Sequence, residues 1–282
     1  MNPFQQIWDF IVYIFTLGGN FDWSIVGHYL FNSFILKGVW LTLLLAVISQ
    51  VTGSIIGLFL ALFKDPRFVV TASPPFDRII KGLLWPLRLF ADFYIWLFRG
   101  TPLLVQLIII YNVFPFFHLT VDSFTAAFLA LSLNEGAYMA EIIRAGIGSV
   151  DTGQMEAAKS LGMTYGQAMR RIVLPQAFRV IIPPLGNEFN SMMKNTSLAA
   201  VISLLELFGT VEQFAAAIFA SLELFFVACV WYLLLTTLWS LVQRQLERRF
   251  NTSKQVKWIQ PPWWQRLIGG RRPALALPQS NQ

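Results

Sequence analysis

The longest apolar stretch of the chain runs from Leu30 to Phe63 and contains a single charged residue, Lys37. A transmembrane helix needs about 20 consecutive apolar residues, so we expect a membrane span at Gly38–Phe63. The composition agrees, because 56% of the 282 residues are hydrophobic and 13% are charged, whereas soluble proteins contain about 25% charged residues. The sequence therefore predicts an all-α integral membrane protein.

Four further spans are expected along the chain. They cover approximately Pro102–Phe117, Ser123–Ile147, Asn187–Leu207 and Ser221–Val242. The N-terminal run Ile7–Leu17 is shorter and is interrupted by Asp9, which favours a short interfacial helix over a sixth span. Leu87–Phe98 has the pattern of a helix near the interface, and we interpret Lys64–Arg88 and Glu206–Ala217 as connectors.

Local patterns predict some details of these spans. Thr101 and Pro102 suit the N-cap and the first helical residue of the second span. The G-x-x-x-G pattern of Gly53 and Gly57 either lets a neighbouring helix approach closely or adds flexibility within the first span. The segment Phe178–Gly186, which contains two adjacent prolines, is expected to lead into the fourth span.

Basic residues cluster in three regions, which are the first connector, the segment around residues 144–179 and the C-terminal tail. These regions hold 18 of the 21 Lys and Arg residues, while the connectors at 118–123 and 206–222 hold none. Cytoplasmic loops of membrane proteins carry the excess of Lys and Arg. Five spans then place the N-terminus outside, the C-terminus inside and residues 151–175 in the cytoplasm.

The stretch Asp151–Pro175 reads as two short helices between membrane spans. Its first residues can cap the first helix, and Gly162 suits the left-handed residue that ends it. Thr164 and Gln167 form a capping box for the second helix. We expect Pro175 to stop that helix.

Several segments of the chain resemble one family of transport proteins. Glu156-Ala157-Ala158, Gly162 and Ile172-Val173-Leu174-Pro175 are similar to the EAA loop of the membrane subunits of ABC importers. Tyr94–Leu107, Asn134–Gly146 and Pro183–Leu198 resemble segments of polar amino-acid ABC permeases of the histidine and glutamine type, which are more specific motifs. The similarity covers roughly residues 38–250 and implies the ABC importer permease fold, with about five core transmembrane helices and cytoplasmic coupling helices.

The resemblance also implies an assembly in the bacterial cytoplasmic membrane. The EAA loop would form the coupling helix that docks into a cytoplasmic ATPase dimer, which binds ATP and magnesium, while this chain binds no cofactor. A second permease subunit, an extracytoplasmic solute-binding protein and an amino-acid substrate complete the expected partners. The residues expected to couple to the ATPase are Glu156, Ala157, Ala158, Ser160, Leu161 and Gly162.

Polar residues within the third and fourth predicted spans are candidates for a substrate pathway, because ionisable groups in a span are costly and tend to serve function. Glu135 is either such a group or the partner of Lys194 in a structural salt bridge, and Glu141 is expected to pair with Arg144. The fourth span either lines a hydrated path or bonds its neighbours. The candidate pathway residues are Asn134, Glu135, Tyr138, Glu141, Asn190, Ser191, Lys194, Asn195 and Thr196.

The expected organisation has three parts. Residues 1–29 form an N-terminal interfacial or extracytoplasmic segment, residues 30–250 form the permease domain with its coupling loop at 151–175, and residues 251–282 form a cytoplasmic tail. Two alternatives to an ABC permease stay open. A secondary transporter would couple transport to protons through Glu135 or Glu141, and a membrane-anchored regulator would bind DNA through the turn at Gly162.

Other sequence patterns narrow the chemistry. The chain has no G-x-x-x-x-G-K-[ST] P-loop, so energy from ATP must come through another protein and this chain is not expected to be an enzyme. His28 and His118 are isolated, which predicts no metal site. The single cysteine, Cys229, excludes an internal disulfide. Met1–Gln6 has no basic residue, and no signal peptide is evident.

Overall fold

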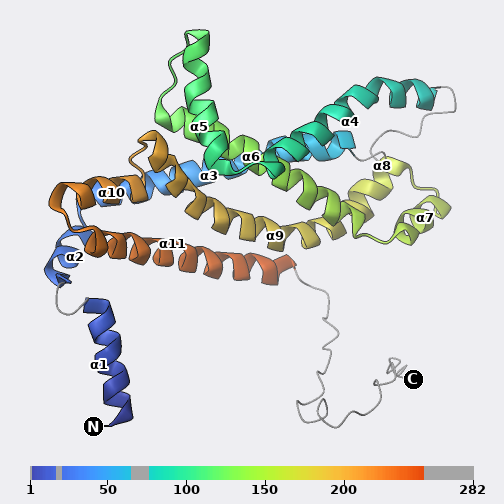
Figure 1. Ribbon diagram of the computed structural model, residues 1–282. Coiled ribbons are helices and arrows are strands. Elements are labelled where there is room, and N and C mark those ends of the chain that lie inside the picture. Colours follow the sequence, from blue (N-terminus) through green and yellow to red (C-terminus); the bar gives the residue numbers. More distant parts are fainter. Residues whose placement is uncertain (1, 17–20, 65–75, 251–282) are drawn as a thin grey trace, which may run out of the picture. The chain divides into compact units, whose positions relative to one another are not determined.

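Helices α3 and α6 form the central pair of the fold (Figure 1). The computed structural model describes residues 2–16, 21–64 and 76–250, and this part contains helices and no strand. Helix α3 (Ser33–Lys64) contains the first expected span, and α6 (Ser123–Gly148) contains the third. A methyl group added at Gly57 would lie 2.5 Å from Cβ of Met139 on α6. The G-x-x-x-G pattern therefore brings the two helices into close contact.

The second expected span is a broken helix. Helix α4 (Phe76–Gly100) and helix α5 (Leu103–Val113), which continues as the 3-10 turn η3 (Phe114–Phe117), meet at an angle of 110°. The expected N-cap was one residue early, because α5 begins after Pro102 and no side chain caps it. Thr101 instead donates a hydrogen bond from Oγ1 to the carbonyl of Leu97 at 2.8 Å. The expected connector Lys64–Arg88 is helical from residue 76, and residues 65–75 lie outside the described part.

The two short helices expected in residues 151–175 are present, but the second continues into the segment of the fourth expected span. Helix α7 (Thr152–Ser160) is followed by α8 (Tyr165–Ala168), the π-helical turn η4 (Met169–Val173), α9 (Leu174–Asn195) and the 3-10 segment η5 (Thr196–Ile202). The expectation that Pro175 stops this helix was wrong. Pro175 lies in the first turn of α9, where no N–H is needed, directly after the wide π turn.

Two adjacent prolines, Pro183 and Pro184, also lie inside α9. The sequence analysis expected this segment to lead into the fourth span, not to be part of one long helix with it. Helix α11 (Ser221–Phe250) supplies hydrogen bonds to carbonyl groups in this region. Gln243 donates from Nε2 to the carbonyl of Pro183 at 3.3 Å, and Trp239 donates from Nε1 to the carbonyl of Gly186 at 2.8 Å. Neighbouring side chains of this kind allow proline within transmembrane helices.

The expected connector after the fourth span is a helix with one buried face, α10 (Leu207–Ile218). Its N-cap, Glu206, is fully buried and accepts a hydrogen bond from the N–H of Gly209 at 2.8 Å. The same carboxylate accepts hydrogen bonds from the hydroxyl groups of Thr42 on α3 and Tyr232 on α11. The carboxylate therefore fixes the start of α10 between two long helices, a role that the sequence analysis missed.

The described part of the N-terminal segment contains two helices, where one was expected. Helix α1 (Pro3–Thr16) covers most of the expected interfacial run, and α2 (Trp23–Leu30) packs against α11. Trp231 on α11 donates a hydrogen bond from Nε1 to the carbonyl of Leu30 at 2.8 Å. Residues up to Phe250 form one unit, which includes α2, so the segment expected to end at residue 29 is joined to the permease domain. The expected tail at 251–282 lies outside the described residues.

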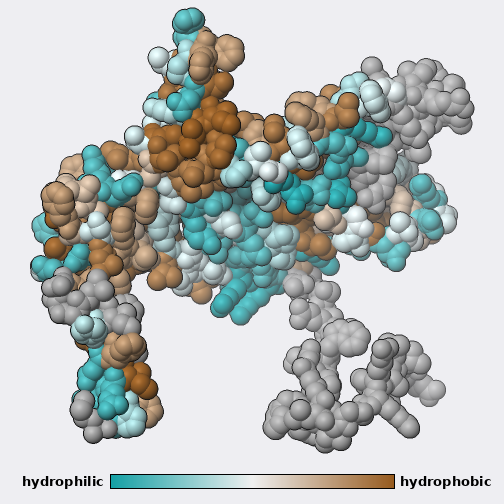
Figure 2. All heavy atoms as spheres, in the orientation of Figure 1, coloured by the Kyte–Doolittle hydropathy of each residue, from teal (hydrophilic) through white to brown (hydrophobic). Residues whose placement is uncertain are grey.

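Two described helices, α3 and α11, are long and apolar enough to cross a membrane as single helices. The broken pair α4–α5 and the helix from Tyr165 to Ile202 with α10 could each supply one further span. Helix α6 is not among these candidates, and it carries the polar residues that the sequence analysis singled out. On the face in Figure 2, hydrophobic side chains gather over α5 and hydrophilic ones over the middle of α9.

Candidate functional site

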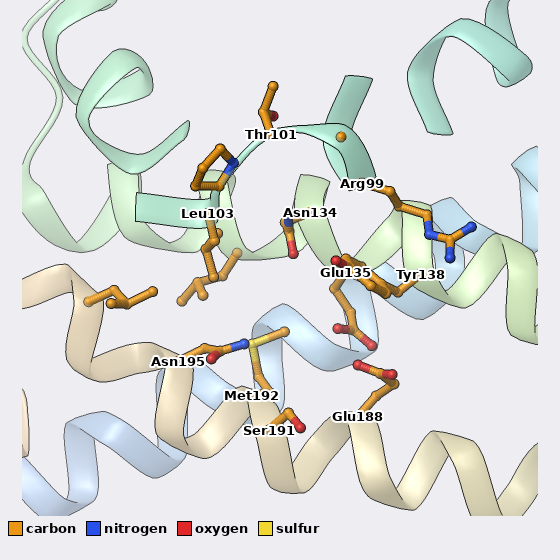
Figure 3. Close-up of a pocket in the computed structure, with 14 residues that line it drawn as sticks. Arg99, Thr101, Leu103, Asn134, Glu135, Tyr138, Glu188, Ser191, Met192 and Asn195 are labelled. Atoms are coloured by element: carbon orange, nitrogen blue, oxygen red, sulfur yellow. The ribbon is translucent and has the colours of Figure 1, made fainter. Parts of the chain in front are cut away.

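A cavity of about 570 Å³ lies between α6, α9 and the bend that joins α4 to α5 (Figure 3). Its volume is within the usual range for small-molecule sites, about 300–1,000 Å³. Five of the predicted pathway residues line it, and these are Asn134, Glu135, Tyr138, Ser191 and Asn195. The structure therefore brings the polar faces of the third and fourth spans together around one space.

Glu135 is the most buried charged residue of this cavity, with 4% of its surface exposed. Its Oε1 accepts a hydrogen bond of 2.6 Å from Nε2 of Gln50 on α3. The alternative of a salt bridge between Glu135 and Lys194 was wrong, because no such ion pair forms and Lys194 lines a different cavity. Close packing of Gly53 against Glu135 holds the carboxylate in position.

Helix α9 contributes a second carboxylate, Glu188, which the sequence analysis did not include among the candidates. Figure 3 shows the side chains of Glu135 and Glu188 pointing toward one another in the cavity. Glu188 forms no hydrogen bond or close ion pair with any residue that the structure describes, although Arg99 attracts it over a longer range. The polar first half of the fourth span contains Glu188, so a signal for it was present in the sequence.

The bend between α4 and α5 forms the remaining wall, through Arg99, Gly100, Thr101, Pro102 and Leu103. Asn134 is held against this wall, since its side chain is hydrogen-bonded to Gln106 and to the carbonyl of Phe98. The sequence analysis missed Arg99 and Gln106. Arg99 is one of three Lys and Arg residues outside the basic clusters, which was the available signal.

Glu141 does not line the cavity and instead forms the centre of a cluster of ion pairs. Arg144 lies 2.7 Å from Glu141, as expected, and Lys64 on α3 lies 3.2 Å from it. Lys64 also pairs with Asp92 on α4 at 3.0 Å, and Arg99 lies 3.7 Å from Glu141. The cluster links α3, α4 and α6, and Arg99 joins it to the cavity.

Three other predicted pathway residues also lie outside this cavity. The carbonyl Oδ1 of Asn190 is buried, with no hydrogen-bond partner among the described residues. Lys194 lines a separate, mostly apolar cavity together with residues of α10 and α11. Thr196 is fully buried and donates a hydrogen bond from Oγ1 to the carbonyl of Met193 at 2.9 Å, where the α-helix changes into η5.

The segment 151–175, which the sequence predicts to be a coupling loop, presents most of its predicted coupling residues to solvent. Glu156, Ala157, Ser160, Leu161 and Gly162 are exposed, whereas Ala158 is buried against the helices behind it. The expected glycine geometry is confirmed, since Gly162 has φ of 76°, and so is the capping box that begins α8. The side chain of Leu161 is 82% exposed at the tip of the loop, where a partner protein can contact it.

Residues 79–252 match the family described as binding-protein-dependent transport system inner membrane component. The chain belongs to this family. It is a membrane permease of the ABC importer type, and the resemblance seen in its sequence is confirmed. Permease subunits of this family act in general with ATPase and binding-protein partners and are generally not catalysts themselves.

Individual relatives cover most of this permease. It is 39% identical over 237 residues to the L-cystine transport system permease protein TcyB of Bacillus subtilis, covering 84% of this chain and 94% of the relative. It is 37% identical over 245 residues to the arginine transport system permease protein ArgU of Corynebacterium glutamicum, covering 82% and 72% respectively. A solved structure titled "Crystal structure of an amino acid ABC transporter with histidines" matches with 38% identity and a TM-score of 0.69, covering 80% of this chain and 97% of that one.

These matches favour the permease over both alternatives drawn from the sequence. The family match at residues 79–252 includes α5, α6, α9 and the segment 151–175. Neither a proton-coupled carrier nor a DNA-binding regulator is among the named relatives described above. An all-α, multi-pass membrane protein with the permease fold is established by the family and by the structural match.

Proposed function

We propose that this chain is the permease subunit of an ATP-driven importer of polar amino acids, and that substrate passes through the cavity between α6, α9 and the α4–α5 bend. The cavity carries this proposal, because it offers carboxylates for an ammonium group, a guanidinium for a carboxylate, and amides and hydroxyls for polar side chains. The names of the relatives, which include arginine and L-cystine permeases, support amino acids as the substrate class.

The energy for transport enters through the coupling loop. A helix end with small exposed residues and a projecting leucine suits insertion into a cleft of an ATPase subunit. ATP and magnesium bind to that partner, and this chain binds no cofactor and catalyses no covalent reaction. The absence of a P-loop from the sequence supports this division of labour.

The complete importer contains a second permease subunit, which is either another copy of this chain or a similar one, two ATPase subunits and an extracytoplasmic solute-binding protein. It lies in the bacterial cytoplasmic membrane with the N-terminus outside and the C-terminus inside. The three basic regions of the sequence support this orientation, since it places all of them on the cytoplasmic side.

Transport follows alternating access to the cavity. Closure of the ATPase pair on ATP pulls on α7 and α8, and α8 continues through η4 into α9, which lines the cavity. ATP and the loaded binding protein must bind the outward-facing state more tightly than the inward-facing state, because a ligand with equal affinity for both shifts neither. The unbroken helical connection gives the motion a direct route from the loop to Glu188 and Ser191.

Reconstitution tests this function. The full chain is placed in proteoliposomes with candidate ABC ATPases and solute-binding proteins, and uptake of labelled amino acids is measured with ATP, with a non-hydrolysable ATP analogue, and with a proton gradient alone. We expect uptake only with hydrolysable ATP. Uptake that follows the proton gradient without nucleotide would establish the secondary-transporter alternative instead, and salt-sensitive binding to specific DNA would establish the regulator.

A further inference from the structure

The positive and negative charges of the side chains that line the cavity do not cancel. Glu135 and Glu188 are the acidic lining residues, and Arg99 is the basic one. With all three ionised, the lining carries one net negative charge. A ligand that completes this site should therefore carry one net positive charge, which a zwitterionic amino acid with a neutral side chain does not.

The guanidinium group of Arg99 lies at the edge of the cavity. It lies 3.7 Å from Glu141, which belongs to the ion-pair cluster outside the cavity, and 5.4 Å from the ring centre of Tyr138. Figure 3 shows this side chain away from the space between Glu135 and Glu188. Arg99 is placed to bind a carboxylate at one end of the cavity, and it leaves the space between the two acidic groups without a cation.

The polar fourth span also contains a basic residue, Lys194, which does not line this cavity. From sequence, Lys194 could equally have supplied a positive charge to the substrate path. It lines a separate cavity of about 410 Å³ with Tyr232 and Cys229, whose surroundings are mostly apolar. Helix α9 therefore contributes no basic side chain to the lining of the first cavity.

Two facing carboxylates disfavour each other's ionisation, and a poorly hydrated site weakens solvent screening, so both stay ionised only where cationic groups bind close to them. Glu135 has one hydrogen bond, from Gln50, and Glu188 has none among the described residues. The α-ammonium group of an amino acid can bind one of these carboxylates. The second carboxylate can then bind another positively charged group on the same ligand.

We propose that this cavity selects amino acids with a positively charged side chain, with Glu135 and Glu188 binding the two cationic groups and Arg99 binding the α-carboxylate. The proposal rests on the proposed function, since it names the kind of amino acid that this permease accepts. Glu188 is the residue that determines specificity. It lies on α9, the helix joined to the coupling loop, so binding of a cationic substrate acts directly on the element that moves.

A pair of nearly isosteric ligands tests the proposal. L-arginine and L-citrulline have the same length and differ in the charge of the terminal group. The binding of each is measured by calorimetry on the full-length chain in lipid nanodiscs. We expect arginine to bind at least about tenfold more tightly than citrulline, because only arginine forms a hydrogen-bonded charge pair with the second carboxylate. Equal affinities would overturn the proposal.

Glu188→Gln should remove most of this preference, because it should weaken arginine binding more than citrulline binding. Glu212→Gln, which alters an exposed carboxylate on α10, is the matched control and should retain the preference. An unchanged preference in Glu188→Gln would overturn the role of Glu188. Should that variant fail to fold, the comparison of arginine with citrulline on the unmodified chain still decides. ATP-driven uptake of citrulline or glutamine in preference to arginine would refute this inference alone, whereas no uptake of any amino acid would refute the proposed function.

Discussion

The side chain of Asn134 on α6 donates a hydrogen bond of 2.9 Å from Nδ2 to Oε1 of Gln106 on α5. Asn134 also donates to the carbonyl of Phe98, and Gln106 donates from Nε2 to the carbonyls of Phe98 and Thr101, at 2.9 and 3.1 Å. These carbonyls lie at the end of α4, where a helix has no partners of its own for its last carbonyls. Two side-chain amides therefore allow a sharp bend within the predicted membrane span.

Replacing Gln106 with leucine should destabilise the permease by about 1–3 kcal/mol, because the carbonyls of Phe98 and Thr101 and the buried amide of Asn134 each lose a partner. The measurement is the free energy of unfolding in detergent micelles, followed by tryptophan fluorescence. Asn112→Leu is the control on the same helix, since Asn112 is exposed and its one side-chain hydrogen bond among the described residues is to the carbonyl of Ile108 at 2.7 Å. Equal stability losses in the two variants would contradict a special role for Gln106.

Close contact between α3 and α6 gives a second prediction. In Gly57→Ala, the new methyl group would meet Cβ of Met139 at 2.5 Å and the backbone nitrogen of Ala140 at 2.8 Å. Overpacking of this kind destabilises a protein by about 1–3 kcal/mol. Gly27→Ala is the control, because this residue lies within α2 and a methyl group added there would meet no other described part of the chain within 4 Å. The same unfolding assay should show a loss for Gly57→Ala and none for Gly27→Ala.

Much of the fold could be predicted from sequence because membrane helices follow from the length and polarity of apolar runs. The first, third and fifth spans lie within α3, α6 and α11. The second and fourth could not be predicted in full. Sequence rules treat Pro175 and the pair at 183 and 184 as helix breaks, whereas a π turn and hydrogen bonds from α11 accommodate them. Such support comes from residues distant in sequence and has no local signal.

The candidate site was also predictable in part, from the spacing of side chains along single helices. Helical spacing placed Asn134 and Tyr138 on one face of α6, and both line the cavity. Periodicity within one helix does not say which neighbouring helix faces it. It therefore could not separate Ser191 and Asn195, which line this cavity, from Lys194, which lines another. The contribution of Arg99 depends on the bend after α4, which is a tertiary feature.

The ion-pair cluster around Glu141 supports a third prediction. Glu141→Gln should lower the free energy of unfolding by roughly 1 kcal/mol, since partly exposed ion pairs contribute only about 0.2–1 kcal/mol each. The loss should shrink at high salt, because salt screens these charges in the unmodified protein. Unfolding measured at low and high ionic strength checks both statements. Glu212→Gln should show neither effect, and a loss that does not depend on salt would indicate that packing, not charge, explains the result.

The exposed tip of the coupling loop gives the last prediction. Leu161→Asp should abolish ATPase co-purification and ATP-driven uptake while leaving the free energy of unfolding unchanged, because the side chain is 82% exposed and contributes little to the core. Leu119→Asp, also at an exposed leucine but in the connector between the second and third spans, should retain both activities. Gly162→Ala adds a methyl group at φ of 76° without a clash, so it should strain the loop by about 1–2 kcal/mol and weaken coupling less than Leu161→Asp does. Full ATPase binding and uptake in Leu161→Asp would show that the ATPase docks elsewhere.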